Sequence, residues 1–436
     1  MASSLRLIAL RACALLLVVS SRPQAQATLL DSANEGRAAW QRAALAQRAG
    51  LADSAWREVG RARAAWPVQP AFEEAYARMA ARRGDVGALV ASLARLTALE
   101  AGAELLEDTT LAALSQRESK VREARTRLEG ALAPPRRTGD LFASDPDTAF
   151  FPEGIDIDAR TRTVYITSVR QRQVAVLGDG QLRPLLAAGT AVGAIIGVRV
   201  DTVRGVLWLT TAKLPHARPI PGGDTLRAEL LRVRMSDGAI ERRWRLGDGT
   251  GVPGELTLAA SGDVFVSDGV KACIYRLRSG GDTLETTRHA LLRSPQGIVV
   301  RDDGAIAWIA DWSHGVLRWD LATGEMQRVR EPDGATLVGL DGMRGYKGRL
   351  IGIQNGIAPS RVVDIVLDRD GRRATTIFTI DRERPYAGDI TVGTIIGDTY
   401  VFVSSSQWPW FDDDGKRIDA RPLPGVVLRA VALRRR

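Results

Sequence analysis

Six short openings of similar sequence recur after residue 150, and this repeat restricts the possible folds more than any other feature of the chain. Each opening combines glycine or a polar residue with the start of an apolar strand, and a second apolar strand follows roughly ten residues later. The polar residues recur at intervals of about 40–60 residues, which is typical of propeller blades when the repeat contains only strands. The openings are PEGI from Pro152, IIGV from Ile195, PGEL from Pro253, PQGI from Pro295, LDGM from Leu340 and GDIT from Gly388. The repeat predicts a mainly β protein with a six-bladed propeller over residues 139–436.

In a propeller the first strand of every blade lines the central axis, so the six openings meet in one small space. Five of them bring an oxygen-bearing side chain, namely Glu153, Glu255, Gln296, Asp341 and Asp389. Four carboxylates around one axis repel one another unless a cation or arginine side chains compensate their charge. Ca²⁺ prefers such oxygen ligands. The alternative is that these residues only make structural hydrogen bonds in the tunnel.

Antiparallel pairing brings the ends of the second strands to the same mouth of the axis. This placement makes Asp268, Asp311 and Asn355 candidate substrate-binding residues, with His314 just beyond them. Trp408 lies in an insertion at 407–424 and is a candidate for stacking on a ligand. The alternatives are that the two aspartates cap turns and that the tryptophan packs between blades.

The propeller half resembles the family of senescence marker protein, gluconolactonase and luciferin-regenerating enzyme. The openings at Pro152, Ser294 and Leu340 carry this resemblance, together with the string IADWSHG from Ile309. Such openings are also similar to those of NHL-repeat and strictosidine-synthase-like proteins. The last strand, 426–433, is expected to close the ring beside a strand at about residues 141–143.

The family resemblance implies a divalent cation, Ca²⁺ in the first place, held above a lactone by a Glu, an Asn and an Asp. Glu153 and Asp341 match two of these ligands, and Gln296 stands where the family has Asn. Gly254-Glu255 stands where the family has an Asn-Asp pair. The metal ligands expected on this basis are Glu153, Gln296 and Asp341, and the general base is Asp341 or Glu255.

The first 27 residues have the features of a signal peptide. Arg6 provides a positive start, an apolar stretch runs from Leu7 to Ser20, and Ala25-Gln26-Ala27 is a small-x-small cleavage site. We expect export to the periplasm or the medium, with no membrane attachment after cleavage; a retained anchor is the alternative. Cleavage leaves Cys273 as a lone cysteine, which is expected to be a core residue.

Residues 28–135 predict a separate helical domain. They are rich in Ala, Leu, Arg and Glu, and their apolar residues recur at helical spacing. Ala49-Gly50-Leu51 and Arg83-Gly84-Asp85 lie at a 34-residue offset between paired helices, which resembles degenerate tetratricopeptide repeats. Further helices are expected at about 104–116 and 117–132. The domain is either a cap on the propeller or a module that binds a protein partner.

The remaining features exclude several classes of function. The formal net charge is +9, but basic residues are interspersed with acids, which argues against a nucleic-acid partner. Three histidines are too few for a His-rich metal site, and no G-x-S-x-G sequence occurs. Two hypotheses remain: a metal-dependent exported hydrolase that acts on a small lactone or related ester, and a non-catalytic binding propeller whose helices recruit a partner.

Overall fold

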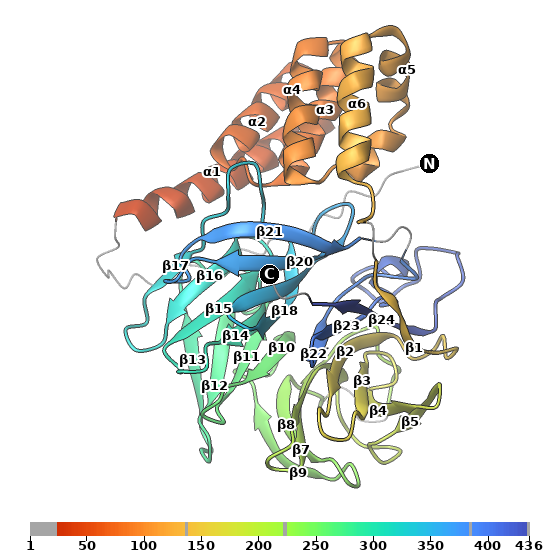
Figure 1. The fold of residues 1–436 in the computed structure, drawn as a ribbon, viewed down its shortest axis with the longest axis vertical. Helices are drawn as coiled ribbons and strands as arrows, with labels where there is room; N and C mark the ends of the chain where they lie inside the picture. Colours follow the sequence, from red (N-terminus) through yellow and green to blue (C-terminus); the bar gives the residue numbers. More distant parts are fainter. Residues whose placement is uncertain (1–23, 136–137, 221–224, 383–385, 434–436) are drawn as a thin grey trace.

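The computed structural model describes residues 24–135, 138–220, 225–382 and 386–433. Helices stand on one side of a ring of sheets in these residues (Figure 1). The signal peptide expected at 1–27 lies outside them except for its last four residues, which are the first turn of α1. No helix of the described ranges is long and apolar enough to cross a membrane.

The helical domain contains two helix pairs followed by shorter helices, as the sequence predicted. Gly84 ends α3 in the left-handed conformation with φ of 67°, and Asp85 caps α4 by accepting the N–H of Ala88 at 3.0 Å. The helices are α1 (Gln24–Arg48), α2 (Ala52–Ala65), α3 (Pro70–Arg83), α4 (Val86–Leu99), η1 (Ala103–Glu107), α5 (Thr109–Arg117) and α6 (Ser119–Ala131).

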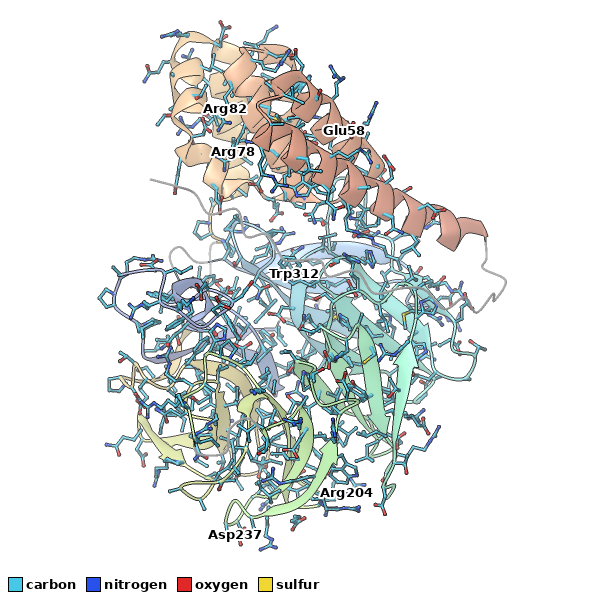
Figure 2. The ribbon with its side chains drawn as sticks, turned by 180° about the vertical axis from the view of Figure 1, so that it is seen from behind. Glu58, Arg78, Arg82, Arg204, Asp237 and Trp312 are labelled. Atoms are coloured by element: carbon cyan, nitrogen blue, oxygen red, sulfur yellow. The ribbon has the colours of Figure 1, made fainter. Side chains whose placement is uncertain are left out.

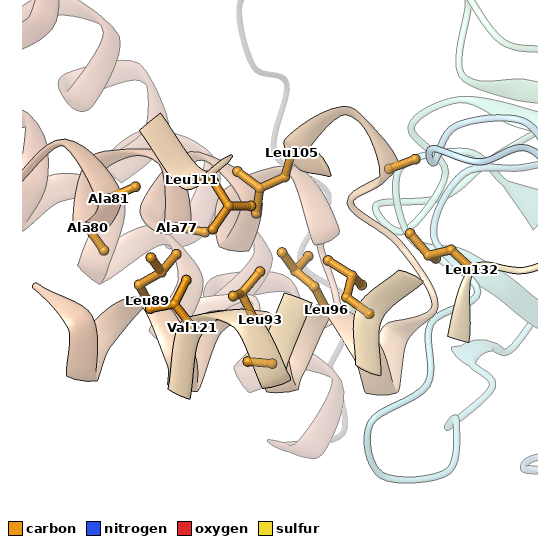
Figure 3. Close-up of a cluster of buried hydrophobic side chains, with 13 residues drawn as sticks. Ala77, Ala80, Ala81, Leu89, Leu93, Leu96, Leu105, Leu111, Val121 and Leu132 are labelled. Atoms are coloured by element: carbon orange, nitrogen blue, oxygen red, sulfur yellow. The ribbon is translucent and has the colours of Figure 1, made fainter. Parts of the chain in front are cut away.

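This domain has its own hydrophobic core (Figure 3). Leu89, Leu93 and Leu96 follow one face of α4 and pack against Leu111 of α5 and Val121 of α6. All five side chains are fully buried. Burial of a leucine stabilises a fold by about 1.5–3 kcal/mol, so this cluster holds the last four helices together.

The described strands form six four-stranded sheets, which are the six predicted blades. Blade one contains β2 (Pro152–Ile157), β3 (Val164–Ser168), β4 (Gln173–Gly178) and β5 (Gln181–Pro184), and blade two contains β6 (Ala194–Asp201), β7 (Val206–Ala212), β8 (Glu229–Arg234) and β9 (Ile240–Arg245). Blade three contains β10 (Pro253–Leu258), β11 (Val264–Asp268), β12 (Cys273–Leu277) and β13 (Leu284–Arg288), and blade four contains β14 (Pro295–Val300), β15 (Ile306–Asp311), β16 (Gly315–Asp320) and β17 (Met326–Arg328). Blade five contains β18 (Leu340–Tyr346), β19 (Arg349–Gln354), β20 (Arg361–Leu367) and β21 (Ala374–Asp381), and blade six contains β22 (Gly393–Ile396), β23 (Thr399–Val403), β24 (Val426–Ala432) and β1 (Asp140–Asp145).

The ring closes through the predicted pairing of the two ends of the propeller. β1 is the outermost strand of blade six and runs antiparallel to β24, with Leu141 opposite Arg429 and Asp145 opposite Val426. A closed ring leaves no open inner edge at the junction between the first and last blades.

The propeller core lies between neighbouring blades. Val174 of blade one packs with Leu207 and Leu209 of blade two, for example, and all three are fully buried. Cys273 of β12 is a buried core residue, as expected. These clusters hold each blade against the next and so fix the inner strands around the axis.

Candidate functional site

The inner strands begin at one end of the axis, which we call the mouth, and their packing identifies equivalent positions. A β-carbon on Gly154 would overlap the carbonyl oxygen of Ile196 in the next blade, so glycine is required at this close approach. Gly197, Gly297 and Gly342 approach the next blade in the same way. In four blades the ring position is the residue before the close-packed glycine, and in the other two it is the residue whose carbonyl approaches the glycine of the preceding blade. We call these six positions the mouth ring: Glu153, Ile196, Gly254, Gln296, Asp341 and Thr391.

Two of the polar residues in the predicted openings lie elsewhere, and the sequence-based equivalence was wrong for them. The N–H of Glu255 donates to Ser267 of its own blade, as the N–H of Gly154 does to Thr167. Glu255 is therefore one residue further along its strand than Glu153. Asp389 lies two residues before the ring position of blade six, which Thr391 occupies.

Glu153 is buried at the mouth and receives two neutral hydrogen-bond donors. Its Oε2 accepts the hydroxyl of Ser406 and the indole N–H of Trp408, each at 2.8 Å. Burial raises the pKa of Glu153 to about 8, and the negative charge of Asp341 acts in the same direction. At neutral pH this carboxyl is mostly protonated.

Asp341 is partly buried and is hydrogen-bonded to one amide. The Nδ2 of Asn355 donates to Oδ2 of Asp341 at 2.7 Å and to the carbonyl of Ile390 at 2.9 Å. Burial raises the pKa of Asp341 to about 7. The Asn355 hydrogen bond lowers this pKa, and the negative charge of Asp389 raises it. Glu153, Asp341 and Asp389 thus form one electrostatically coupled acidic cluster.

Gln296 lies in the mouth ring but is directed toward blade three. Its side-chain oxygen lies over Gly254, its Nε2 lies beside Gly269, and Nε2 donates to the hydroxyl of Ser294 at 3.3 Å. Two of the three predicted metal ligands, Glu153 and Asp341, are electrostatically coupled, whereas Gln296 leans away toward the neighbouring blade.

The donor chemistry of the acidic cluster fits a hard divalent cation. The charged groups that most affect the pKa values of Glu153 and Asp341 are carboxylates, and no arginine or lysine is among those groups. Carboxylate oxygens of this kind are preferred ligands of hard divalent cations. Among the described residues, no three His, Cys, Asp or Glu side chains form a group that could hold a metal ion. Within these residues, the three carboxyls of the acidic cluster therefore do not converge as one set of metal ligands.

Glu255 occupies the layer beneath the mouth ring and is held by two arginines that the sequence analysis did not identify. Arg344 of β18 contacts its carboxylate at 2.5 and 3.3 Å, and Arg199 of β6 contacts it at 3.4 and 3.5 Å. Burial raises the pKa of Glu255 to about 8, and Arg199 opposes this. We call these three residues the arginine clamp. Arg199 directly follows the opening IIGV, and Arg344 directly follows the opening LDGM. Alignment of this position across the blades would have identified both arginines as residues at the axis.

Tyr400 brings a buried hydroxyl toward the same layer. Its ring passes the inner strand at Gly393, where a β-carbon would meet the hydroxyl at 2.6 Å. The hydroxyl has no hydrogen-bond partner, and burial raises the pKa of Tyr400 well above its usual value, with the charge of Glu255 next in importance.

Asp311 and Asp268 stabilise turns, as the structural alternative proposed. Asp311 accepts the backbone N–H groups of Arg293 and Ser294 on one oxygen and of Ser313 and His314 on the other, at 2.8–3.0 Å. Asp268 accepts three backbone N–H groups on Oδ1, and its Oδ2 is buried without a partner. Neither carboxylate is directed at the acidic cluster by these bonds.

His314 lies between the propeller and the helical domain, and not among the mouth residues. Its Nδ1 pairs with the carbonyl of Leu291 at 2.8 Å, and Nε2 pairs with the Arg37 guanidinium at 3.1 Å. A carbonyl can only accept, so Nδ1 carries the proton and Nε2 accepts from Arg37. Burial lowers the pKa of His314, which keeps the ring neutral. The predicted substrate-binding role therefore does not fit this residue, because both ring nitrogens are already engaged.

Trp408 joins two insertions above blade one. It is the first residue of η3 (Trp408–Trp410), and its ring meets Phe151 edge-on at 4.9 Å and His216 at 5.0 Å. His216 belongs to the β7–β8 connection and pairs with the carbonyl of Asp412 at 3.0 Å. The indole thus places an aromatic surface beside Glu153, while its N–H is used by that carboxyl.

The comparison with solved structures gives matches at low sequence identity. Selenomethionine-substituted virginiamycin B lyase from Staphylococcus aureus is 14% identical, with 67% of this chain and 99% of that chain covered and a TM-score of 0.47. A streptogramin B lyase structure is 16% identical, with coverage of 67% and 96% and a TM-score of 0.43. A structure of a nidogen/laminin complex is 16% identical, with coverage of 53% and 81% and a TM-score of 0.41. No protein-family model and no curated protein matches the chain.

Proposed function

We propose that the protein is a hydrolase of a lactone or related ester, with the reaction at the mouth of the propeller. The observation that carries this proposal is the coupled pair Glu153 and Asp341, whose pKa values of about 8 and about 7 lie on either side of neutral pH. Carboxyls tuned to this range are typical of general acid–base catalysis. The resemblance of the openings to gluconolactonase-like propellers agrees with this class of substrate.

The two carboxyls supply the proton transfers of ester hydrolysis. Ionised Asp341 would take a proton from water as the water oxygen bonds to the ester carbonyl carbon. The bond from that carbon to the alkoxide oxygen then breaks, and protonated Glu153 would give its proton to the alkoxide. The product is a hydroxy acid, and return of one proton from Asp341 to Glu153 through solvent restores the site.

We further propose that the site takes a divalent cation, with Ca²⁺ as the first candidate. Glu153 and Asp341 would hold it in their ionised forms, as an alternative to the acid–base pair described above. Such a cation supplies Lewis-acid polarisation of the ester carbonyl. Its affinity depends on ionised carboxylates and would therefore rise with pH across the titration of the pair.

The test is hydrolysis of a panel of aldonolactones and aliphatic lactones, with added Ca²⁺ and with chelator. We expect a bell-shaped pH profile of kcat/KM with limbs near the pKa values of the pair, and loss of turnover in Asp341→Asn and Glu153→Gln. Asp302→Asn serves as the control, because Asp302 is exposed and lies in the turn after β14. Metal analysis of the purified protein shows whether the cation is part of the site. Equal turnover by wild type and Asp341→Asn would refute the catalytic assignment.

A binding propeller is the second candidate function, and the orientation of Gln296 favours it. With that amide turned toward blade three, the coupled pair lacks the third ligand that the family resemblance implies. In this case a ligand would raise the melting temperature without being converted. Calorimetry with the same lactones distinguishes binding from turnover.

Export remains a proposal that rests on the sequence of residues 1–27. We propose that the mature protein begins near Thr28 in the periplasm or the medium. Mass spectrometry of the protein from those fractions tests this, and a chain that retains Met1 in a membrane fraction would contradict it.

A further inference from the structure

Two neighbouring loops of the propeller run from the acidic cluster to the helical domain. The β15–β16 loop covers residues 312–314, and the β19–β20 loop covers residues 355–360. Trp312 lies close to the junction of the two domains, as its label in Figure 2 shows. The first residue of the β19–β20 loop contacts Asp341, and the first residue of the β15–β16 loop contacts that residue in turn. Both loops contact the helices two or three residues later.

At the mouth, the two loops fix the orientation of one amide. The indole N–H of Trp312 donates to Oδ1 of Asn355 at 3.3 Å, and Nδ2 of Asn355 donates to Asp341 at 2.7 Å. An indole N–H is only a donor, so it selects the amide orientation that turns the NH₂ group toward Asp341. Gly356 lies beneath the Trp312 ring, where a β-carbon would approach the ring to 2.7 Å.

At their other ends, both loops are bound by helical residues. The carbonyl of Ala358 accepts the N–H groups of Gly102 at 2.8 Å and Ala103 at 3.0 Å. Ile357 is buried against Leu99 and Ala101. In the other loop, His314 pairs with Arg37 of α1, as described above.

A half-buried ion cluster beside the β19–β20 loop joins the helical domain to blade five. Glu100 ends α4 and accepts hydrogen bonds from Arg361 at 2.9 Å, from Thr379 at 2.8 Å and from Arg382. Arg361 also donates to Gln354, which precedes Asn355, at 2.7 Å. Both arginines are buried, and Glu100 is their carboxylate partner, so this contact favours a single docked arrangement.

We propose that Asn355 and Trp312 are positioning residues for Asp341, and that the helical domain holds them in place through the two loops. The proposal rests on the function proposed above, in which Asp341 is the general base. It also assigns a role to the helical domain: it completes the scaffold of the site, beyond serving as a cap.

The expected effect is a loss of orientation at the mouth. Nδ2 of Asn355 reaches Asp341 at 2.7 Å while Trp312 and the β19–β20 loop hold the amide in place. Displacement of that loop from the helical side should therefore break the Asn355–Asp341 hydrogen bond without any substitution at the mouth.

The experiment is a double-mutant cycle between the helical side and the mouth. Leu99→Ala removes packing against Ile357, and Asn355→Ala removes the donor to Asp341. The first readout is the side-chain amide signal of Asn355 by NMR in full-length protein labelled with ¹⁵N at asparagine, assigned by its loss in Asn355→Ala. This signal reports the hydrogen bond to Asp341 and does not depend on turnover. The second readout is kcat/KM for a lactone, measured across the cycle. Leu89→Ala is the matched control, because it removes the same atoms from the other end of α4.

We expect kcat/KM to fall about tenfold in Asn355→Ala and about threefold in Leu99→Ala, and we expect Leu99→Ala to displace the Asn355 amide signal. Leu99→Ala should add nothing to the loss of kcat/KM when Asn355 is already alanine, and Leu89→Ala should leave both readouts unchanged. Trp312→Phe keeps the ring and removes its donor, so it should displace the amide signal even if Leu99→Ala fails to fold.

An unchanged Asn355 amide signal in both folded Leu99→Ala and Trp312→Phe would overturn the proposal, as would an effect of Leu99→Ala on kcat/KM that persists without Asn355. If the signal moves in these variants while the wild type turns over no lactone, the positioning stands and only the proposed hydrolase function is refuted. If the wild type turns over a lactone and the signal does not move in the variants, the hydrolase function stands and the positioning is refuted.

Discussion

The mouth ring and the layer beneath it place similar carboxylates in opposite surroundings. Glu153 accepts hydrogen bonds from neutral donors and feels the negative charge of Asp341, whereas Glu255 contacts two guanidinium groups. The two positions differ by one residue along equivalent strands, and side chains alternate in direction along a strand. The difference is one of charge: the carboxyls of the acidic cluster contact neutral donors and can exchange a proton or take a cation, whereas Glu255 is held in the framework by two guanidinium groups.

The largest effect that tests this contrast is expected for Asp341→Asn. The amide cannot accept a proton from water, so kcat/KM for a lactone substrate should fall about 10²–10⁴-fold. Stability should not fall, because the change removes a carboxyl that the surrounding protein disfavours in its charged form. Measurement of kcat/KM and of thermal unfolding on the same preparation checks both parts, and a joint loss of activity and stability would contradict the contrast.

The arginine clamp should respond in the opposite way. Above pH 8, where Glu255 is ionised, Glu255→Gln leaves Arg199 and Arg344 without a negative partner, and the unfolding free energy should fall by about 3 kcal/mol. Denaturant unfolding measures this change, with Glu285→Gln as the control, because Glu285 pairs with Arg278 on the surface. The loss of kcat/KM per folded molecule should be much smaller than in Asp341→Asn. A greater loss would return Glu255 to the role of general base.

The pH dependence of stability sharpens the comparison. The pKa of Glu153 is raised in the fold to about 8 from an ordinary value of 4.5, so the folded state holds its proton more tightly than the unfolded state. Its stabilising contribution is therefore complete below about pH 4.5 and is lost as pH rises toward 8. Glu153→Gln should flatten this fall and stabilise the chelator-treated protein at pH 7 by about 3 kcal/mol. Melting temperatures of both proteins between pH 4.5 and 8 test it, and parallel curves would contradict it.

The smallest expected effect concerns one hydrogen bond. Trp408→Phe removes a donor that favours ionised Glu153, so the pKa of Glu153 should rise and the alkaline limb of the pH profile should move up by about half a unit. Trp410→Phe is a control from the same short helix, since its N–H donates to the carbonyl of Arg421. An equal shift in both variants would mean that the loop, and not the hydrogen bond, controls Glu153.

The fold could be predicted from the sequence because each blade repeats a local pattern. Strand periodicity is directly visible in a sequence. It was sufficient to predict the openings, the apolar second strands and the pairing of the first and last strands of the propeller. The same applies to the helix pairs, whose turns at Gly50 and Gly84 are visible as breaks in helical spacing.

The position of a site residue could be predicted only in the blades whose openings align without a shift. Glu153 and Asp341 occupy equivalent ring positions, but PGEL and GDIT carry their acids one and two residues from that position. A polar residue near an opening is visible in the sequence, whereas the β-bulge that fixes the direction of its side chain is not. Five inner strands contain such a register shift, and β22 pairs without one. His314 was misplaced because its partners, Arg37 and Trp66, come from the other domain.

The pairing of β1 with β24 has a consequence for how the chain acquires its structure. β1 follows the helical domain directly, yet its sheet partner lies at Val426–Ala432, almost the full length of the propeller later. During synthesis β1 therefore waits as an unpaired strand until the last residues have been made, and the ring can close only then. Contacts of such long sequence separation form slowly. The helical domain, whose contacts are local, can fold well before this, so the propeller assembles beside a helical surface that is already in place.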